Sequence, residues 1–149
     1  MVIGKTTFLN ALSGKAKLYG TVKGQILINN NPKLSIESLQ AEIGFVPQED
    51  TCHEDLTVYE NLYYAAMLKL PSKFTLERKL QIIDSVLEML GITAIRNSVV
   101  GSVEKRGISG GQKKRLSIGM ELVSHPKLIF LDEVNFINIF RRYILLNVF

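Results

Sequence analysis

Two segments of this sequence have residue types that could bind phosphate groups at the start of a helix. The first is Gly4-Lys5-Thr6-Thr7, which leads directly into apolar residues at helical spacing. Free backbone N–H groups at a helix N-terminus attract anions, and Gly4 lets the backbone approach them. Lys5 would reach the β- and γ-phosphates of a nucleotide, and the Thr6 hydroxyl would bind Mg²⁺. The segment matches the second half of a phosphate-binding loop, whose full pattern has another glycine five residues before Gly4.

The second segment is Ser109-Gly110-Gly111-Gln112, and it has three interpretations. Ser109 and Gln112 fit a capping box, although two adjacent glycines in a first turn each cost about 1 kcal/mol relative to alanine. Residues 107–111 also fit the Gly-x-Ser-x-Gly pattern of a nucleophile elbow, but a hydrolase triad needs an acid and then a histidine after the serine, and here His125 precedes Asp132 and no histidine comes later. The third interpretation is another phosphate-binding helix start, since the glycines expose backbone N–H groups and Ser109 adds a hydroxyl.

Two acidic residues follow a wholly apolar stretch near the end of the sequence. Residues 128–131 read Leu-Ile-Phe-Leu, which predicts a strand buried on both faces of a parallel sheet. Asp132 and Glu133 would then lie at the carboxyl edge, where doubly wound sheets bind ligands. Asp132 would hold Mg²⁺ directly or through water. Glu133 would orient an attacking water or accept a proton from it.

Alternating strands and helices must position these residues, so the predicted fold class is α/β with a helical insert at about 55–105. The clearest helix has leucine and isoleucine at positions 76, 80, 83, 87 and 90. A capping box formed by Thr57 and Glu60 opens the helix before it. Helices are expected from 5 to near 14, from 57 to about 70, from 76 to 90 and from 109 to about 123, and strands at 24–31, 43–46 and 128–131.

Composition and charge exclude several classes of protein. The 149 residues are 46% hydrophobic and 21% charged, which excludes disorder, and the single Cys52 excludes an internal disulfide and a cysteine-built zinc site. A net charge of +4 is far from a nucleic-acid-binding arm, so no nucleic-acid partner is expected. Residues 113–115 are basic and would add positive potential near phosphates; taken alone they would form a solvated helix face or, as the lesser alternative, a weak nuclear-import signal. Arg141 and Arg142 interrupt the most apolar stretch, so no transmembrane helix is expected.

The order of these segments resembles that of ABC transporter nucleotide-binding domains, from residue 3 to about 133. Gly-Lys-Thr-Thr is followed by Gln48 after a strand, then by Ile-Ser-Gly-Gly-Gln, and finally by four apolar residues with Asp-Glu. The amino-acid sequence of residues 44–50, 53–62 and 103–115 resembles that of the G subfamily of white-type half-transporters. The resemblance implies a P-loop NTPase fold of the ABC ATPase type, a partial sheet with a helical subdomain.

The resemblance also implies roles for individual residues. Gly4, Lys5, Thr6 and Thr7 match the end of the Walker A loop that binds ATP, and Gln48 matches the glutamine that senses Mg²⁺ and the attacking water. The signature residues that cap the γ-phosphate held by the opposite subunit correspond to Ser109, Gly110, Gly111 and Gln112. Asp132 matches the Walker B ligand of Mg²⁺, and Glu133 matches the catalytic base.

The function expected from this resemblance is ATP binding and hydrolysis that power export of a substrate. The chain would act at the cytosolic face of a membrane, with a second nucleotide-binding domain and a transmembrane domain that this chain does not contain. Residues 1–133 would form a partial nucleotide-binding domain cut at both ends, and residues 134–149 a divergent apolar tail. The isolated chain is therefore expected to be weak or inactive in hydrolysis. The alternative is a catalytically incompetent fragment that only binds nucleotide or pairs with an intact domain.

Overall fold

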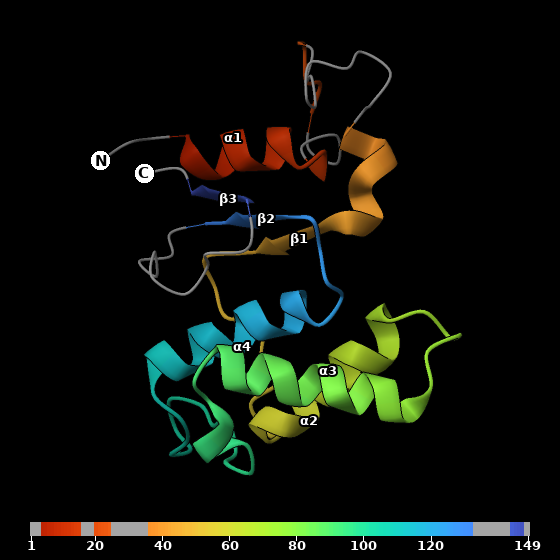
Figure 1. Cartoon of the computed structure of the whole chain (residues 1–149). Helices are drawn as coiled ribbons and strands as arrows, with labels where there is room; N and C mark the ends of the chain where they lie inside the picture. Colours follow the sequence, from red (N-terminus) through yellow and green to blue (C-terminus); the bar gives the residue numbers. More distant parts are fainter. Residues whose placement is uncertain (1–3, 16–19, 25–35, 133–143, 148–149) are drawn as a thin grey trace. The chain divides into compact units, whose positions relative to one another are not determined.

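The computed structural model describes residues 4–15, 20–24, 36–132 and 144–147, and it divides into two compact units (Figure 1). Unit 1 comprises Met1–Gln48 and Pro126–Phe149, and unit 2 comprises Glu49–His125. Unit 1 holds the strands, an α-helix and the 3-10 helix η2 (Ile36–Glu42), whereas unit 2 is helical. Unit 2 is wider than the helical insert predicted at about 55–105, because it also contains the helix that follows Ser109.

The strands of unit 1 form a parallel sheet in the order β1-β2-β3. Their bounds are Ile43–Val46 for β1, Leu128–Leu131 for β2 and Ile144–Asn147 for β3. The strands predicted at 43–46 and 128–131 are confirmed, and that at 24–31 lies outside the described residues except for Gly24. The sequence pattern did not predict β3. It pairs with the second edge of β2, whose backbone N–H and C=O groups need partners.

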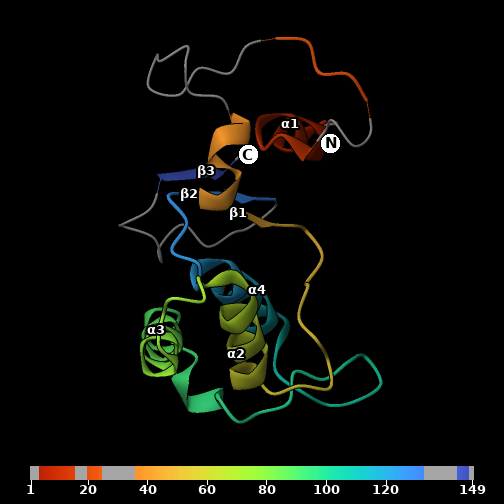
Figure 2. The same ribbon diagram turned by 90° about the vertical axis from the view of Figure 1, so that its right-hand side faces the viewer.

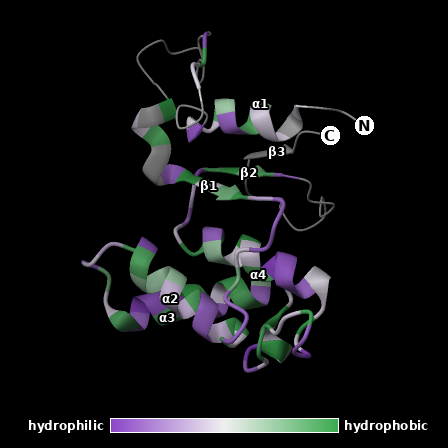
Figure 3. Ribbon diagram, turned by 180° about the vertical axis from the view of Figure 1, so that it is seen from behind, coloured by the Kyte–Doolittle hydropathy of each residue, from purple (hydrophilic) through white to green (hydrophobic). Residues whose placement is uncertain are grey.

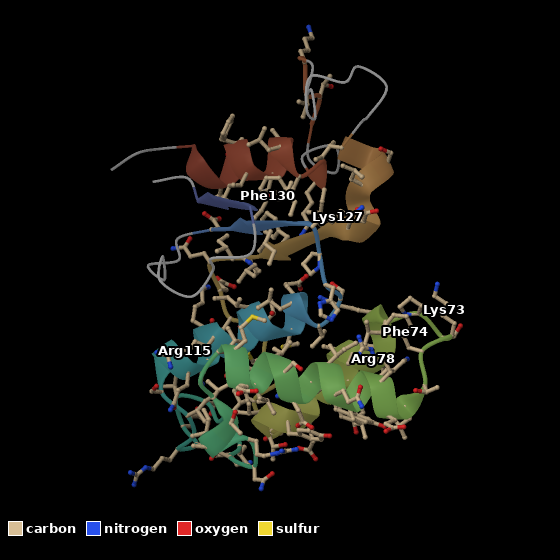
Figure 4. All side chains as sticks on the ribbon, viewed as in Figure 1. Lys73, Phe74, Arg78, Arg115, Lys127 and Phe130 are labelled. Atoms are coloured by element: carbon tan, nitrogen blue, oxygen red, sulfur yellow. The ribbon has the colours of Figure 1, made fainter. Side chains whose placement is uncertain are left out.

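Helix α1 (Lys5–Leu12) lies along one face of this sheet (Figure 1). Leu9 of α1 and Phe130 of β2 are each 1% exposed and form part of the core of unit 1. Figure 4 shows Phe130 on β2, below α1. The helix ends at Ser13 as its C-cap, followed by Gly14 with a φ of 76°, so the predicted end near Gly14 is confirmed. Phe8 is 54% exposed and therefore does not belong to the buried stripe expected for this helix.

Unit 2 is a bundle of three helices that pack against one another (Figure 2). Its elements are α2 (Val58–Lys69), α3 (Leu76–Met89), the 3-10 helix η3 (Thr93–Ile95) and α4 (Gly110–Leu122). Gly119 permits a close approach of these helices, since a Cβ there would lie 2.9 Å from Leu90 Cδ1 and 3.0 Å from Leu62 Cδ2. Within the described ranges, no helix of either unit has the length and apolar character needed to cross a membrane.

The predicted capping box at the start of α2 is confirmed. Thr57 Oγ1 accepts a hydrogen bond from Glu60 N at 3.1 Å, and Thr57 N donates to Glu60 Oε2 at 2.8 Å. The hydrogen bond from the Thr57 backbone lowers the pKa of Glu60. The carboxylate form that the capping box requires is therefore favoured at neutral pH.

Helix α3 has the predicted bounds to within one residue, but its buried face differs from the predicted stripe. Ile83 and Leu87 are fully buried as predicted, whereas Leu76 is 56% exposed. Lys79, predicted to lie off the stripe, is only 8% exposed. Leu76 is the first residue of α3 and adjoins the turn from α2, whereas the hydrocarbon stem of a lysine can cover apolar surface farther along the helix.

Candidate functional site

The carboxyl edge of the sheet brings together residues that the sequence places 84 positions apart. Val46 and Leu131 are paired as the last residues of β1 and β2, and Asp132 N donates to Val46 O at 3.1 Å. Asp132 directly follows β2 and Gln48 follows β1 by two residues, so both lie at this edge. Figure 1 shows that α1 begins at the same edge. The elements that carry three of the predicted site segments therefore converge within unit 1.

The start of α1 has the backbone geometry of an anion-binding helix terminus. Gly4 is its N-cap with a φ of 106°, a conformation that L side chains rarely adopt. No side chain of the described residues caps the helix, so its first backbone N–H groups are free of a side-chain acceptor there and can bind an anion. Among the residues that the structure describes, no neighbouring group lies within 4 Å of a Cβ built at Gly4.

Asp132 has the surroundings of a carboxylate that needs a cation. It is 2% exposed, and the described residues give its side chain no hydrogen bond or ion pair. Burial of a carboxylate charge is costly, so a bound cation would stabilise it. The Thr6 hydroxyl, the Gln48 amide oxygen and the Asp132 carboxylate are all hard oxygen donors of the kind Mg²⁺ prefers.

A magnesium ion at this edge would need ligands besides protein side chains. The described residues contain no cluster of three or more His, Cys, Asp or Glu side chains that could hold a metal ion. Mg²⁺ in nucleotide sites is commonly bound by one or two protein oxygens together with substrate phosphates and water. The residues present therefore fit an ion that arrives with a nucleotide.

The described part of the structure does not include the side chains of two predicted site residues. Lys5 is the first residue of α1, but its side chain lies outside the described residues, and Glu133 lies outside them altogether. Their predicted roles with phosphate and with the attacking water stay predictions. Thr6 and Thr7 are exposed in the first turn of α1.

The Ser109–Gln112 segment, in unit 2, forms the start of α4. Ser109 Oγ accepts from Gln112 N at 3.3 Å, and Ser109 N donates to Gln112 Oε1 at 2.8 Å, so the capping-box interpretation is confirmed. A turn, not a strand, precedes Ser109, which excludes a nucleophile elbow. Helix geometry still leaves the N–H groups of Gly110 and Gly111 without an intrahelical acceptor. The phosphate-binding interpretation is thus compatible with the cap.

Two glycines bring the two ends of the loop that leads into α4 into backbone contact, and we call residues 101–107 the pinched loop. Gly101 has a φ of 74°, and a Cβ built at Gly107 would lie 2.6 Å from Gly101 Cα. Ile108 N donates to Val100 O at 3.1 Å across the base of the loop. The contact between backbones that only glycine permits therefore determines where Ser109 begins the helix. The sequence did not predict the contact between these two glycines, whose only signal is that they flank a short polar segment.

The basic run after the signature segment is not a freely solvated helix face. Lys113 Nζ donates to Gly101 O at 2.5 Å, which joins α4 to the pinched loop. Lys114 Nζ lies 3.8 Å from Asp50 Oδ1, and the Lys114 side chain is only 13% exposed. These contacts replace the solvated face expected from the sequence and direct two of the three cations to acceptors within unit 2.

The single cysteine packs beside α4. Cys52 Sγ lies 3.1 Å from Ser117 Oγ and 3.5 Å from Lys113 O. Burial raises the pKa of the Cys52 thiol, and the hydrogen bond with Ser117 offsets part of that rise. At neutral pH the thiol is therefore protonated and poorly nucleophilic.

We expect Cys52 to react with a disulfide reagent such as dithionitrobenzoate at least roughly tenfold more slowly than free cysteine at neutral pH. The reason is that the thiolate is scarce and the sulfur half-buried. The reaction rate is measured from the absorbance of the released thiolate. It should rise on denaturation, and in the native chain it should keep rising with pH after the rate for free cysteine has levelled off. A native chain that reacts as fast as free cysteine would contradict this assignment.

A model of the ABC transporter family matches residues 3–135, which is most of the chain. The chain therefore belongs to the ABC transporter family, as the order of its motifs predicted. Domains of this family bind nucleotide, and ATP hydrolysis coupled to transport is typical of them.

Two plant relatives confirm the resemblance to the G subfamily. ABC transporter G family member 28 of Arabidopsis thaliana is 50% identical over 131 residues, which are 87% of this chain and 12% of that protein. ABC transporter G family member 25 of Oryza sativa subsp. japonica is 46% identical over 130 residues, or 87% of this chain and 13% of that protein. The chain thus spans about an eighth of the length of these relatives.

A solved structure confirms the predicted fold class. The cbiO1 protein from Clostridium perfringens, described as part of the ABC transporter complex cbiONQ, matches with a TM-score of 0.65 and 27% identity. The match covers 87% of this chain and 49% of that one. The α/β fold is therefore that of an ABC-type P-loop NTPase, represented here by a partial sheet and a helical unit.

Proposed function

We propose that this chain is the ATP-binding and ATP-hydrolysing portion of a G-type ABC transporter that powers export of a substrate. It would act at the cytosolic face of a membrane. The observation that carries the proposal is the meeting of Asp132, Gln48 and the uncapped start of α1 at one edge of the sheet. A buried carboxylate beside an anion-binding helix terminus suits a magnesium-bound phosphate chain.

Each residue would have a distinct task in this site. Lys5 and the backbone N–H groups of the first turn of α1 would bind and orient the phosphates of ATP. Thr6 and Asp132 would hold Mg²⁺, which when bound neutralises negative charge on the phosphates. Gln48 would orient the attacking water, and Glu133 would accept its proton.

The second phosphate-binding helix start supports a partnership with another nucleotide-binding domain. Ser109, Gly110 and Gly111 begin α4 in unit 2, whereas α1 and Asp132 belong to unit 1. We propose that the Ser109–Gln112 segment contacts the γ-phosphate of ATP held by an opposite subunit in a head-to-tail dimer. A transmembrane domain would receive the resulting motion.

Substituting Asp132→Asn tests the magnesium site directly. Mg²⁺ should strengthen ATP binding by the parent chain. In the variant the factor by which Mg²⁺ increases the affinity for ATP should be roughly fivefold smaller, because the amide keeps an oxygen but lacks the charge. Calorimetric titration with ATP, with and without Mg²⁺, measures the difference. Asp84→Asn makes the same change at an exposed carboxylate in unit 2 and should keep the full gain. An unchanged magnesium dependence in Asp132→Asn would overturn the assignment.

A further inference from the structure

The turn between α2 and α3 is a corner of unit 2 that exposes apolar and basic side chains together. Leu68, near the end of α2, is 86% exposed, and Leu76, at the start of α3, is 56% exposed. Lys73 lies between them on the turn, and Arg78 follows in the first turn of α3; both are exposed. Figure 4 shows Lys73, Phe74 and Arg78 at this end of the two helices, and Figure 3 shows hydrophobic and hydrophilic residues next to one another there.

The cations at this corner are not neutralised by the residues around them. Within the described part of the chain, neither Lys73 nor Arg78 forms an ion pair; Arg78 Nη1 donates only to the neutral Gln81 Oε1, at 3.4 Å. Lys69, by contrast, is paired with Glu121 at 2.6 Å. Glu77 is the one acidic residue between positions 68 and 79. The corner therefore presents positive charge to whatever it contacts.

We infer that this α2–α3 corner, formed by Leu68, Lys73, Phe74, Leu76 and Arg78, contacts the surface of a membrane that contains anionic lipids. Basic side chains are attracted to the negative surface potential of such a membrane, and exposed leucines enter the boundary between headgroups and acyl chains. The two leucines flank the turn on different elements, with Lys73 between them in the chain and Arg78 after Leu76 in the first turn of α3. This surface is distinct from the residues proposed to bind nucleotide.

The small extent of the corner favours a lipid surface over a protein partner. A stable protein interface usually involves about 20–30 residues on each side. Five side chains at one corner are too few for that, but a planar array of lipid headgroups can bind a few cations and leucines reversibly. The alternative occupant of the corner is an acidic protein, and binding of polyglutamate distinguishes it from a lipid surface.

The test is flotation of the full 149-residue chain with vesicles of phosphatidylcholine alone or mixed with phosphatidylserine. We expect binding only to the mixed vesicles, and at least about tenfold weaker binding by Lys73→Glu/Arg78→Glu. Lys23→Glu/Arg106→Glu makes the same change in net charge at exposed residues elsewhere and should bind as the parent does. Leu68→Ser/Leu76→Ser keeps every charge and should bind several-fold more weakly.

A tryptophan reporter adds a readout that does not depend on the charge changes. The chain has no tryptophan, so Leu68→Trp gives a single emission signal from the corner. Its emission should shift to the blue with phosphatidylserine vesicles, whereas Met89→Trp, at the other end of α3, should not respond.

Several results would overturn the inference. They are equal binding to both kinds of vesicle, no vesicle binding, retention of binding by Lys73→Glu/Arg78→Glu, and equal loss in the charge-matched control. Binding of polyglutamate without binding of vesicles would assign the corner to an acidic protein instead. Vesicle binding that persists in Lys5→Ala would separate this surface from the nucleotide site.

Discussion

Replacing Gly107 by alanine is expected to destabilise unit 2 by about 3 kcal/mol. A Cβ at this position would lie 2.6 Å from Gly101 Cα, 2.5 Å from Val100 C and closer still to Val100 O. These are backbone atoms, so no rotamer change can relieve the overlap. Relief would require the loop to open, which would break the hydrogen bond from Ile108 N to Val100 O.

Urea unfolding followed by circular dichroism measures this loss, because α2, α3 and α4 provide most of the helix in the described residues. Gly110→Ala is the matched control. Apart from the backbone of α4 itself and the two chain neighbours, no atom of the described residues lies within 4 Å of a Cβ at Gly110, the first residue of α4, so this variant should be as stable as the parent or slightly more stable. If Gly107→Ala unfolds at the same urea concentration as the parent, the pinched loop does not contribute to stability as we argue.

Replacing Lys5 by alanine is expected to weaken ATP binding by about tenfold to a hundredfold. A lysine at the start of a phosphate-binding helix contributes a charge-assisted hydrogen bond, worth about 1.5–3 kcal/mol. Those energies correspond to the stated range of affinity. The start of α1 can still donate backbone N–H groups in the variant, so residual binding should remain.

Titration calorimetry with Mg-ATP measures the Lys5→Ala effect. Lys23→Ala removes an exposed lysine from unit 1 with the same change in net charge and should leave the affinity within a factor of two of the parent's, which is about 0.4 kcal/mol. Equal losses in the two variants would mean that Lys5 acts only through general charge. No loss in Lys5→Ala would remove the phosphate site from α1.

The sequence was sufficient to predict the elements whose signals are local. The capping boxes at Thr57 and Ser109 determine where α2 and α4 begin, and both were readable from a hydroxyl residue followed three positions later by Glu or Gln. The continuous apolar run at 128–131 predicted a buried parallel strand because such strands have no solvent-facing side. The position of Asp132 at the carboxyl edge follows from that strand.

Features that depend on distant contacts could not be predicted. The glycines at 101 and 107 matter because their backbones touch, and nothing in their immediate neighbours indicates that contact. The spacing of leucines on α3 could not show that Leu76 adjoins a turn and stays exposed. Likewise, Lys113 reads as a solvated cation until the structure places its ammonium on the Gly101 carbonyl.

The pairing of β1 with β2 imposes an order on the folding of this chain during synthesis. Residues 43–46 must wait for residues 128–131, whereas unit 2 is continuous and lies wholly between them. At typical elongation rates the ribosome needs on the order of ten seconds to make the intervening stretch. The three-helix bundle can therefore form first, whereas β1 is synthesised early and has to wait for β2 to pair with it. Unit 1, which carries Asp132, therefore completes its fold last, and until then the edge of β1 that pairs with β2 stays open to other partners.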